Sequence, residues 1–132
     1  MNFKARLITE SDYDNILKQW WKDWRWQAPP KDFLPFNFNG IMVSNDEHDI
    51  CACFIYNTNS QVCWLEFIIS NFDVKDRELR KAAFNFMIET VKNSIQAKYI
   101  YTSMRKQSLI NDMKNLGFME GSSDCTELIF IK

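Results

Sequence analysis

The sequence predicts an α+β domain in which a mixed central β-sheet carries helices on both faces. Three strand-like segments follow one another between residues 41 and 70, and a long helix-like segment begins at Arg77. Shorter strand and helix patterns then alternate toward the end of the chain. Three consecutive strands followed by a β-α-β-α-β order are typical of an α+β fold with a mixed sheet.

Length and composition indicate one folded unit. The 132 residues are enough for one hydrophobic core and too few for two ordinary domains, so we expect a single domain over residues 1–132. The composition, 46% hydrophobic and 25% charged, is that of a folded chain. A net charge of -1 disfavours nucleic-acid binding that depends on bulk positive charge.

The chain carries no signal for export, membrane insertion or metal binding. No run approaches the roughly 18 apolar residues of a membrane span. The first residues also lack the apolar core of a signal peptide. The four cysteines form neither a Cys-x-x-Cys pair nor a ligand set with the single histidine, so we expect free, mostly buried thiols and no metal site. A cytoplasmic protein without membrane partners is the interpretation that follows.

The N-terminal part predicts a strand, a helix and an irregular loop. Residues 3–8 alternate as in a strand, and Thr9–Asp12 supply capping residues for a helix of about 14 residues. The apolar stripe of this helix consists of Tyr13, Ile16, Leu17, Trp20, Trp21 and Trp24. Three prolines break regular structure over residues 25–39, a segment with room for one helical turn. Because this segment is rich in aromatic residues, we expect a functional loop and not a disordered one.

The remaining segments predict the sheet and two more helices. Strands are expected over residues 41–44, 50–57, 62–70, 98–103 and 125–131. The second and third of these are apolar on both faces, which is typical of central strands. A helix over 77–95 has the predicted stripe Leu79, Ala82, Ala83, Phe86, Thr90 and Val91. Ser108 is the predicted cap of the last helix, and Gly117 is its predicted end.

The junction between the apolar strand 62–70 and the next helix is the most informative segment. Free backbone N–H groups at the start of a helix attract anions, and three cations lie in the first turn and a half. These cations are Arg77, Arg80 and Lys81. The junction therefore predicts an anion site, with a plain strand-to-helix connection and solvated charges as the alternative.

This order of elements resembles the GNAT superfamily of N-acetyltransferases over nearly the whole chain. Residues 6–12 look like the first strand of that superfamily running into its first helix, and residues 108–118 are similar to its late helix ending in Gly-Phe. The superfamily's pyrophosphate pattern Gln/Arg-x-x-Gly-x-Gly/Ala corresponds to residues 77–82, with Arg80 in place of the central glycine. The Trp-rich first helix and the glycine-poor phosphate loop resemble a compact group that is frequent in bacteriophage genomes.

The resemblance implies an acetyl-CoA-dependent N-acetyltransferase in which an amine attacks the thioester directly. The residues that it implies for the pyrophosphate are Arg77, Leu79, Arg80 and Lys81. It further implies that the backbone of Ile68 and Ile69 pairs with the pantetheine arm and polarises the thioester carbonyl. Asn111 would bond the same arm, unless it is only a polar residue on the exposed face of its helix.

Glu66 is the candidate catalytic base. It is the only charged residue in its strand, on the predicted face of Trp64 and Ile68, and a desolvated carboxylate has a raised pKa. The alternative is that Glu66 lies near a strand edge or pairs with a lysine or arginine.

The resemblance also implies a general acid. In that superfamily the acid is often a tyrosine four residues before the glycine of Gly-Phe, where this chain has Met113. Tyr101 is our candidate to replace it, and an ordinary core or surface tyrosine is the alternative.

Aromatic residues predict where the acceptor binds. Trp26, Phe33 and Phe36 lie outside regular structure, and together with Trp64 they would form the walls against which a cationic amine rests. The acceptor would be a small-molecule or protein amine. The alternative function is a catalytically inactive GNAT-fold module that binds a protein partner or small ligand through the same loop, as in phage–host interplay. Exposed sheet edges favour a homodimer.

Overall fold

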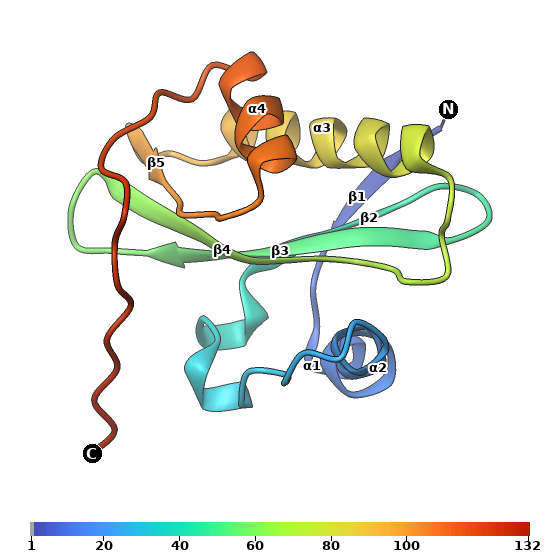
Figure 1. The fold of residues 1–132 in the computed structure, drawn as a ribbon. Coiled ribbons are helices and arrows are strands. Elements are labelled where there is room, and N and C mark those ends of the chain that lie inside the picture. Colours follow the sequence, from blue (N-terminus) through green and yellow to red (C-terminus); the bar gives the residue numbers. More distant parts are fainter. Residues whose placement is uncertain (1) are drawn as a thin grey trace.

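One five-stranded sheet, in the order β1-β2-β3-β4-β5, organises the chain (Figure 1). The computed structural model describes residues 2–132. Its strands are β1 (Lys4–Leu7), β2 (Gly40–Ser44), β3 (Asp49–Asn57), β4 (Val62–Ser70) and β5 (Tyr99–Tyr101). Strands β1 to β4 pair antiparallel, and β5 joins β4 in parallel. The mixed sheet that the sequence predicts is confirmed.

Helices cover both faces of this sheet. They are α1 (Glu10–Asp12), a π-helical turn (Tyr13–Leu17), α2 (Lys18–Asp23), α3 (Arg77–Ser94) and α4 (Gln107–Asn115). The first three form one continuous helix on the lower face in Figure 1, whereas α3 and α4 lie on the upper face. Within residues 2–132, no helix is long and apolar enough to cross a membrane.

The predicted stripe of the first helix is the buried one. Its members Tyr13, Leu17, Trp20 and Trp21 are buried against the lower face of the sheet. Thr9 and Asp12 form the predicted capping box, in which each side chain bonds the backbone N–H of the other. The helix therefore begins at the expected place because its first free N–H groups find side-chain partners.

The predicted stripe of α3 is only partly correct. Ala83 and Val91 are buried, but Phe84, Met87 and Ile88 form the rest of the buried face. Phe86 lies half-buried beside the ring of Phe3 at a centroid distance of 5.6 Å. The helix has apolar residues on two sides, and its packing against β2 and β3 buries a side that differs in part from the predicted stripe.

Three predictions for the C-terminal part are wrong. No side chain caps α4, which begins at Gln107 after Lys106, so Ser108 is not its cap. Strand β5 has three residues instead of the six expected over 98–103. Residues 125–131 form no strand, because no backbone among residues 2–132 pairs with them. Gly117, with a φ of 98°, does end the helix as predicted.

The aromatic loop 25–39 is ordered by contacts to the lower layer and the sheet. It contains two 3-10 turns, Lys31–Phe33 and Phe36–Phe38, where one turn was expected. Tyr13 and Tyr56 donate hydrogen bonds to its backbone, at Pro29 O (2.6 Å) and Phe33 O (2.9 Å). The buried Tyr13 and the half-buried Tyr56 thus bond backbone carbonyl groups of a loop that has no strand or long helix of its own to pair them.

The thiols are mostly buried, as predicted. Cys51, Cys53 and Cys63 lie in the core between the sheet and α3, and Cys125 is exposed. Burial raises the pKa of the Cys51 thiol to about 12, so this group stays protonated and unreactive.

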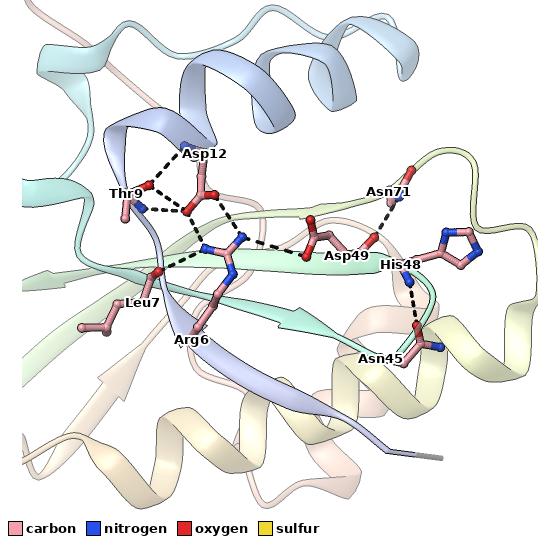
Figure 2. Close-up of polar contacts among 8 residues, drawn as sticks. All are labelled: Arg6, Leu7, Thr9, Asp12, Asn45, His48, Asp49 and Asn71. Carbon is pink, nitrogen blue, oxygen red and sulfur yellow. Dashed lines mark hydrogen bonds and ion pairs between the residues drawn. The ribbon is translucent and has the colours of Figure 1, made fainter.

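A charged clamp joins β1, the first helix and β3 (Figure 2). Arg6 Nη1 and Nη2 donate to the Asp12 carboxylate at 2.7 and 3.0 Å, and Nη2 lies 3.9 Å from Asp49 Oδ1. Thr9 N donates to the same Asp12 carboxylate at 2.8 Å. Burial by itself raises the pKa of Asp12, but the hydrogen bonds from Arg6 and Thr9 outweigh it and hold this pKa below its usual value.

Replacing Asp12 with asparagine should lower the free energy of unfolding by about 1–3 kcal/mol at neutral pH, because hydrogen bonds to a charged group are lost. A carboxylate with a lowered native pKa stabilises the fold above its unfolded pKa, and this contribution disappears as pH falls below about 4. Urea unfolding at several pH values measures both effects. Asp14→Asn, which removes an exposed carboxylate bound to Lys31, should cost less than about 1 kcal/mol. Equal losses for the two variants would contradict the assignment.

Candidate functional site

Strand β4 contains a bulge at Phe67. Ala52 lies opposite Ile69 and Phe54 lies opposite Glu66, so β4 has one residue more than β3 between these pairs. Phe67 has a φ of 53°, in the left-handed region, which accommodates the extra residue. Beyond it the alternation of side chains is shifted by one residue.

The bulge overturns one prediction about faces. Ile68 packs against the upper core, whereas Phe67 and Ile69 belong to the lower one. Glu66, whose strand neighbour Leu65 is in the upper core, shares the lower face with Trp64 and not with Ile68. The expected common face of Glu66 and Ile68 is wrong because an inserted residue reverses the period-two pattern.

Strands β4 and β5 diverge next to this bulge. Their pairing covers only Val62–Trp64, and Thr102 Oγ1 then donates to Leu65 O at 2.7 Å as the last link between them. Past this link the chain leaves the sheet to enter α4, and a cavity of about 450 Å³ opens. Residues 65–68 of β4, residues 102–105, Leu109 and Trp26 line it. Past Trp64, the backbone groups of β4 on this side have no strand partner within the described residues 2–132.

Glu66 lies in the wall of this cavity. Its side chain has no hydrogen bond or ion pair with any residue between 2 and 132, although Arg105 lines the same cavity. Burial raises the pKa of the Glu66 carboxyl, and the charge of Glu127 on the C-terminal segment raises it further. The carboxylate is thus half-buried, electrostatically uncompensated and a stronger proton acceptor than an ordinary glutamate.

Two of the three predicted loop aromatics lie near Glu66. Trp26 lines the cavity and stacks on Trp24 at a centroid distance of 5.6 Å. Phe33 meets the ring of Phe67 edge-on at 5.8 Å. Phe36 lies elsewhere, in the wall of a second cavity between the loop and the ends of β1 and β3. The aromatic loop therefore contributes to the site through its first and middle parts only.

Three aromatic residues share the lower face of the sheet with Glu66. Trp64 and Tyr101 are in ring contact, with centroids 4.2 Å apart, and Tyr101 does not line the cavity. Tyr56 lies opposite Trp64 in the neighbouring strand. Burial and the charge of Glu66 raise the pKa of Tyr56 to about 12, so this phenol keeps its proton. Tyr56 could not be predicted from the sequence pattern, because only the strand register places it here.

The start of α3 is capped by its own chain. Asp76 Oδ1 accepts hydrogen bonds from Glu78 N at 3.0 Å and Leu79 N at 3.2 Å, and Arg80 N donates to Asp76 O at 3.0 Å. Two of the expected free N–H groups are therefore already bonded, because an aspartate precedes the helix and caps it. Asp76, a favoured N-cap residue directly before the predicted helix, is the sequence signal from which this cap could be predicted.

The predicted cations and the remaining candidate residues lie as follows. Arg77 is exposed, Arg80 is half-buried, and Lys81 lies 3.6 Å from Asp112 of α4. Asn111 accepts a hydrogen bond from Gln107 at 2.9 Å and does not line the cavity. Ile69 is buried in the lower core. An anion at this end of α3 would thus meet side-chain cations and not bare backbone.

No protein-family model matches the sequence, and no curated protein is significantly similar to it. Solved structures do share its fold. The ribosomal-protein-S18-alanine N-acetyltransferase of Escherichia coli superposes with a TM-score of 0.67 at 12% identity, over 92% of this chain and 80% of the other. A GNAT-family acetyltransferase of Streptococcus pneumoniae gives 0.64 at 11% identity, over 99% and 97%. An acetyltransferase of Trypanosoma brucei gives 0.62 at 14%, over 97% and 100%. The chain therefore has the fold of the GNAT acetyltransferases.

Proposed function

We propose that this chain is an acetyl-CoA-dependent N-acetyltransferase that acts on an amine. The observation that carries the proposal is the cavity between the diverging strands β4 and β5, with the unpaired Glu66 in its wall. Unpaired strand backbone in a cavity can hydrogen-bond an extended molecule such as the acetyl donor. An uncompensated carboxylate in the same cavity can attract the cationic amine that accepts the acetyl group.

The residues present fit the pantetheine arm of acetyl-CoA better than its pyrophosphate. Past Trp64, the backbone of β4 has no strand partner on the β5 side among residues 2–132, so the N–H and C=O groups of residues 66–68 can bond the amides of a pantetheine arm. Asp76 occupies the start of α3, so the pyrophosphate would depend on the side chains of Arg77 and Arg80. When bound, acetyl-CoA supplies an acetyl group activated as a thioester.

In the proposed reaction, Glu66 takes the proton that the acceptor ammonium must lose before it can attack. The N–C bond then forms as the C–S bond breaks, and the leaving thiolate takes up a proton from water, because the candidate acid Tyr101 does not line the cavity. Trp26, Phe33 and Trp64 would hold the acceptor through contacts between a cation and ring faces. Phe36 lies outside this site and has no role in the proposal.

The alternative is a binding module without acetyltransferase activity. The cap on α3 favours it, because the carboxylate of Asp76 uses two N–H groups that would otherwise receive a phosphate and adds a negative charge there. In that case, the exposed Trp26 and its neighbours would contact a protein partner or a small ligand.

Calorimetric titration with acetyl-CoA and with CoA distinguishes the proposed enzyme from the binding module. The enzyme should bind with a Kd of roughly 1–100 µM, within the usual range of KM values. Arg77→Glu should weaken this binding by about tenfold, because it reverses a charge close to the proposed pyrophosphate. Absence of binding up to millimolar concentrations of either compound would rule out the enzyme.

Removing the cap should strengthen cofactor binding. We expect Asp76→Ala to lower the Kd for CoA by about tenfold, because it removes a negative charge and frees two N–H groups. The same change should cost about 1 kcal/mol of stability through loss of the cap. Asp73→Ala, at an exposed aspartate in the same connection, is the matched control and should leave both values unchanged. Weaker binding by Asp76→Ala would show that the pyrophosphate binds elsewhere.

A further inference from the structure

A second cavity lies between the aromatic loop and the ends of β1 and β3. Its volume is about 310 Å³, at the lower end of the range of roughly 300–1,000 Å³ that is typical of ligand pockets. It shares no lining residue with the cavity of Glu66. Most of its wall consists of two exposed apolar side chains and of side-chain amides: Leu7, Phe36, Asn37, Asn39 and Asn57. The reaction proposed above uses none of these residues.

The polar groups of this cavity are uncharged. Within the described part of the chain, none of the residues that line it is an acid, a lysine, an arginine or a histidine. A charged ligand would lose hydration there without meeting an opposite charge. The side chains of Asn37 and Asn57 have no hydrogen bond with any residue between 2 and 132, so their amides are available to a ligand. The lining therefore favours a neutral occupant that forms hydrogen bonds.

Contacts with the sheet and the core hold this wall in place. Asn39 is bonded twice to β3, because its Nδ2 donates to Ile55 O at 2.8 Å and its O accepts from Ile55 N at 2.9 Å. Asn37 and Phe38 both have left-handed backbone, with φ values of 58° and 54°. This conformation is unfavourable for phenylalanine, and the Phe38 ring is held in the lower core beside that of Tyr13, at a centroid distance of 6.0 Å. Backbone held in this way is often found at binding sites, where it forms the wall before the ligand arrives.

A sugar ring has the chemistry that fits this wall. Each of its hydroxyls both donates and accepts, and a side-chain amide likewise has a donor nitrogen and an acceptor oxygen. The C–H face of a sugar ring is apolar, and the Phe36 ring is 96% exposed at the cavity. A nucleotide fits less well, because its phosphate would meet no cation in the described wall.

We propose that this cavity binds a neutral saccharide. The Phe36 ring packs against the apolar face of one sugar ring, and the amides of Asn37, Asn39 and Asn57 bond its hydroxyls. The site is separate from the cavity of Glu66, so the proposal does not depend on acetyltransferase activity.

The side-chain amide signals of the asparagines in a proton–nitrogen NMR spectrum report on the site directly. The probes are maltose, lactose, cellobiose and N,N′-diacetylchitobiose, each added up to roughly 20 mM, above the Kd on the order of 1 mM that we expect for a small open site. At least one of them should shift the signals of Asn37 and Asn57 in a saturable way. The signal of Asn93, an exposed residue on α3, should not move.

Variants show whether the wall itself binds the sugar. Phe36→Ala and Asn57→Ala should each weaken the binding by about tenfold, as expected for loss of a central contact. Both side chains are exposed, so neither change should disturb the fold. Asn37→Gly removes an amide but keeps the left-handed backbone, and it should have a similar effect. Asn93→Ala is the matched control and should bind as the wild type does.

Three results would overturn the proposal. The first is that none of the saccharides shifts the signals of Asn37 and Asn57. The second is that adenosine shifts these signals and the saccharides do not, which would make the cavity a nucleobase site. The third is that a saccharide shifts the indole signal of Trp26 and leaves the asparagines unchanged, which would place the sugar in the cavity of Glu66.

Discussion

Replacement of Glu66 by glutamine is expected to reduce kcat/KM for acetyl transfer by about 10²- to 10⁴-fold, the usual contribution of a positioned general base. Glutamine keeps the shape and the hydrogen-bonding reach of the side chain but cannot accept the proton of an ammonium. Because Glu66 has no partner among residues 2–132, the substitution breaks no ion pair there and the fold should be unaffected. Initial rates with a panel of amines and acetyl-CoA measure the effect.

The pH profile distinguishes a base from a residue that only binds the acceptor. Burial and the charge of Glu127 raise the pKa of Glu66, so wild-type activity should fall with decreasing pH at values above the ordinary carboxyl range. Glu127→Gln removes the neighbouring charge and should shift this acid-side loss of activity to lower pH. Glu47→Gln, at an exposed residue in the β2–β3 turn, should change nothing. An unaltered rate in Glu66→Gln would remove this residue from the mechanism.

Replacement of Gly40 by alanine is expected to lower the free energy of unfolding by about 3 kcal/mol or more, at the upper end of overpacking effects. A Cβ atom there would lie 2.3 Å from Cys53 O and 3.1 Å from the Cα of Phe54, both in the backbone of the central strand β3. Backbone atoms cannot change rotamer to avoid a clash as a flexible side chain can, so strands β2 and β3 would have to move apart. Thermal or urea unfolding gives the value.

Gly121 provides the matched control for this prediction. A Cβ atom at Gly121 would have no neighbour within 4 Å, so Gly121→Ala should change stability by less than about 0.5 kcal/mol. If both variants were equally stable, β2 and β3 could not lie as close together as the structure has them. Because Gly40 follows the aromatic loop directly, a shift of β2 should also disturb Trp26 and the cavity.

Local sequence patterns predicted most of the elements. The alternation and composition of residues 62–70 define β4, and the stripe from Tyr13 to Trp21 is the buried face of the first helix. These predictions succeed because strand and helix periodicity depend on neighbours a few residues away. The stripe of α3 was misjudged because two apolar sides compete there, and only the sheet beneath it selects one.

By itself, the sequence determined the α+β class, the order of the first eight strands and helices, and the position of a lone acidic residue, Glu66, within an apolar strand. The tertiary structure alone decided what surrounds that residue. The bulge at Phe67 places Ile68 on the opposite face from Glu66, and the separation of β5 from β4 opens the cavity. It also decided that Tyr56 neighbours Glu66 and that residues 125–131 remain unpaired. Register shifts and strand separation arise from contacts between distant parts of the chain, which no local pattern encodes.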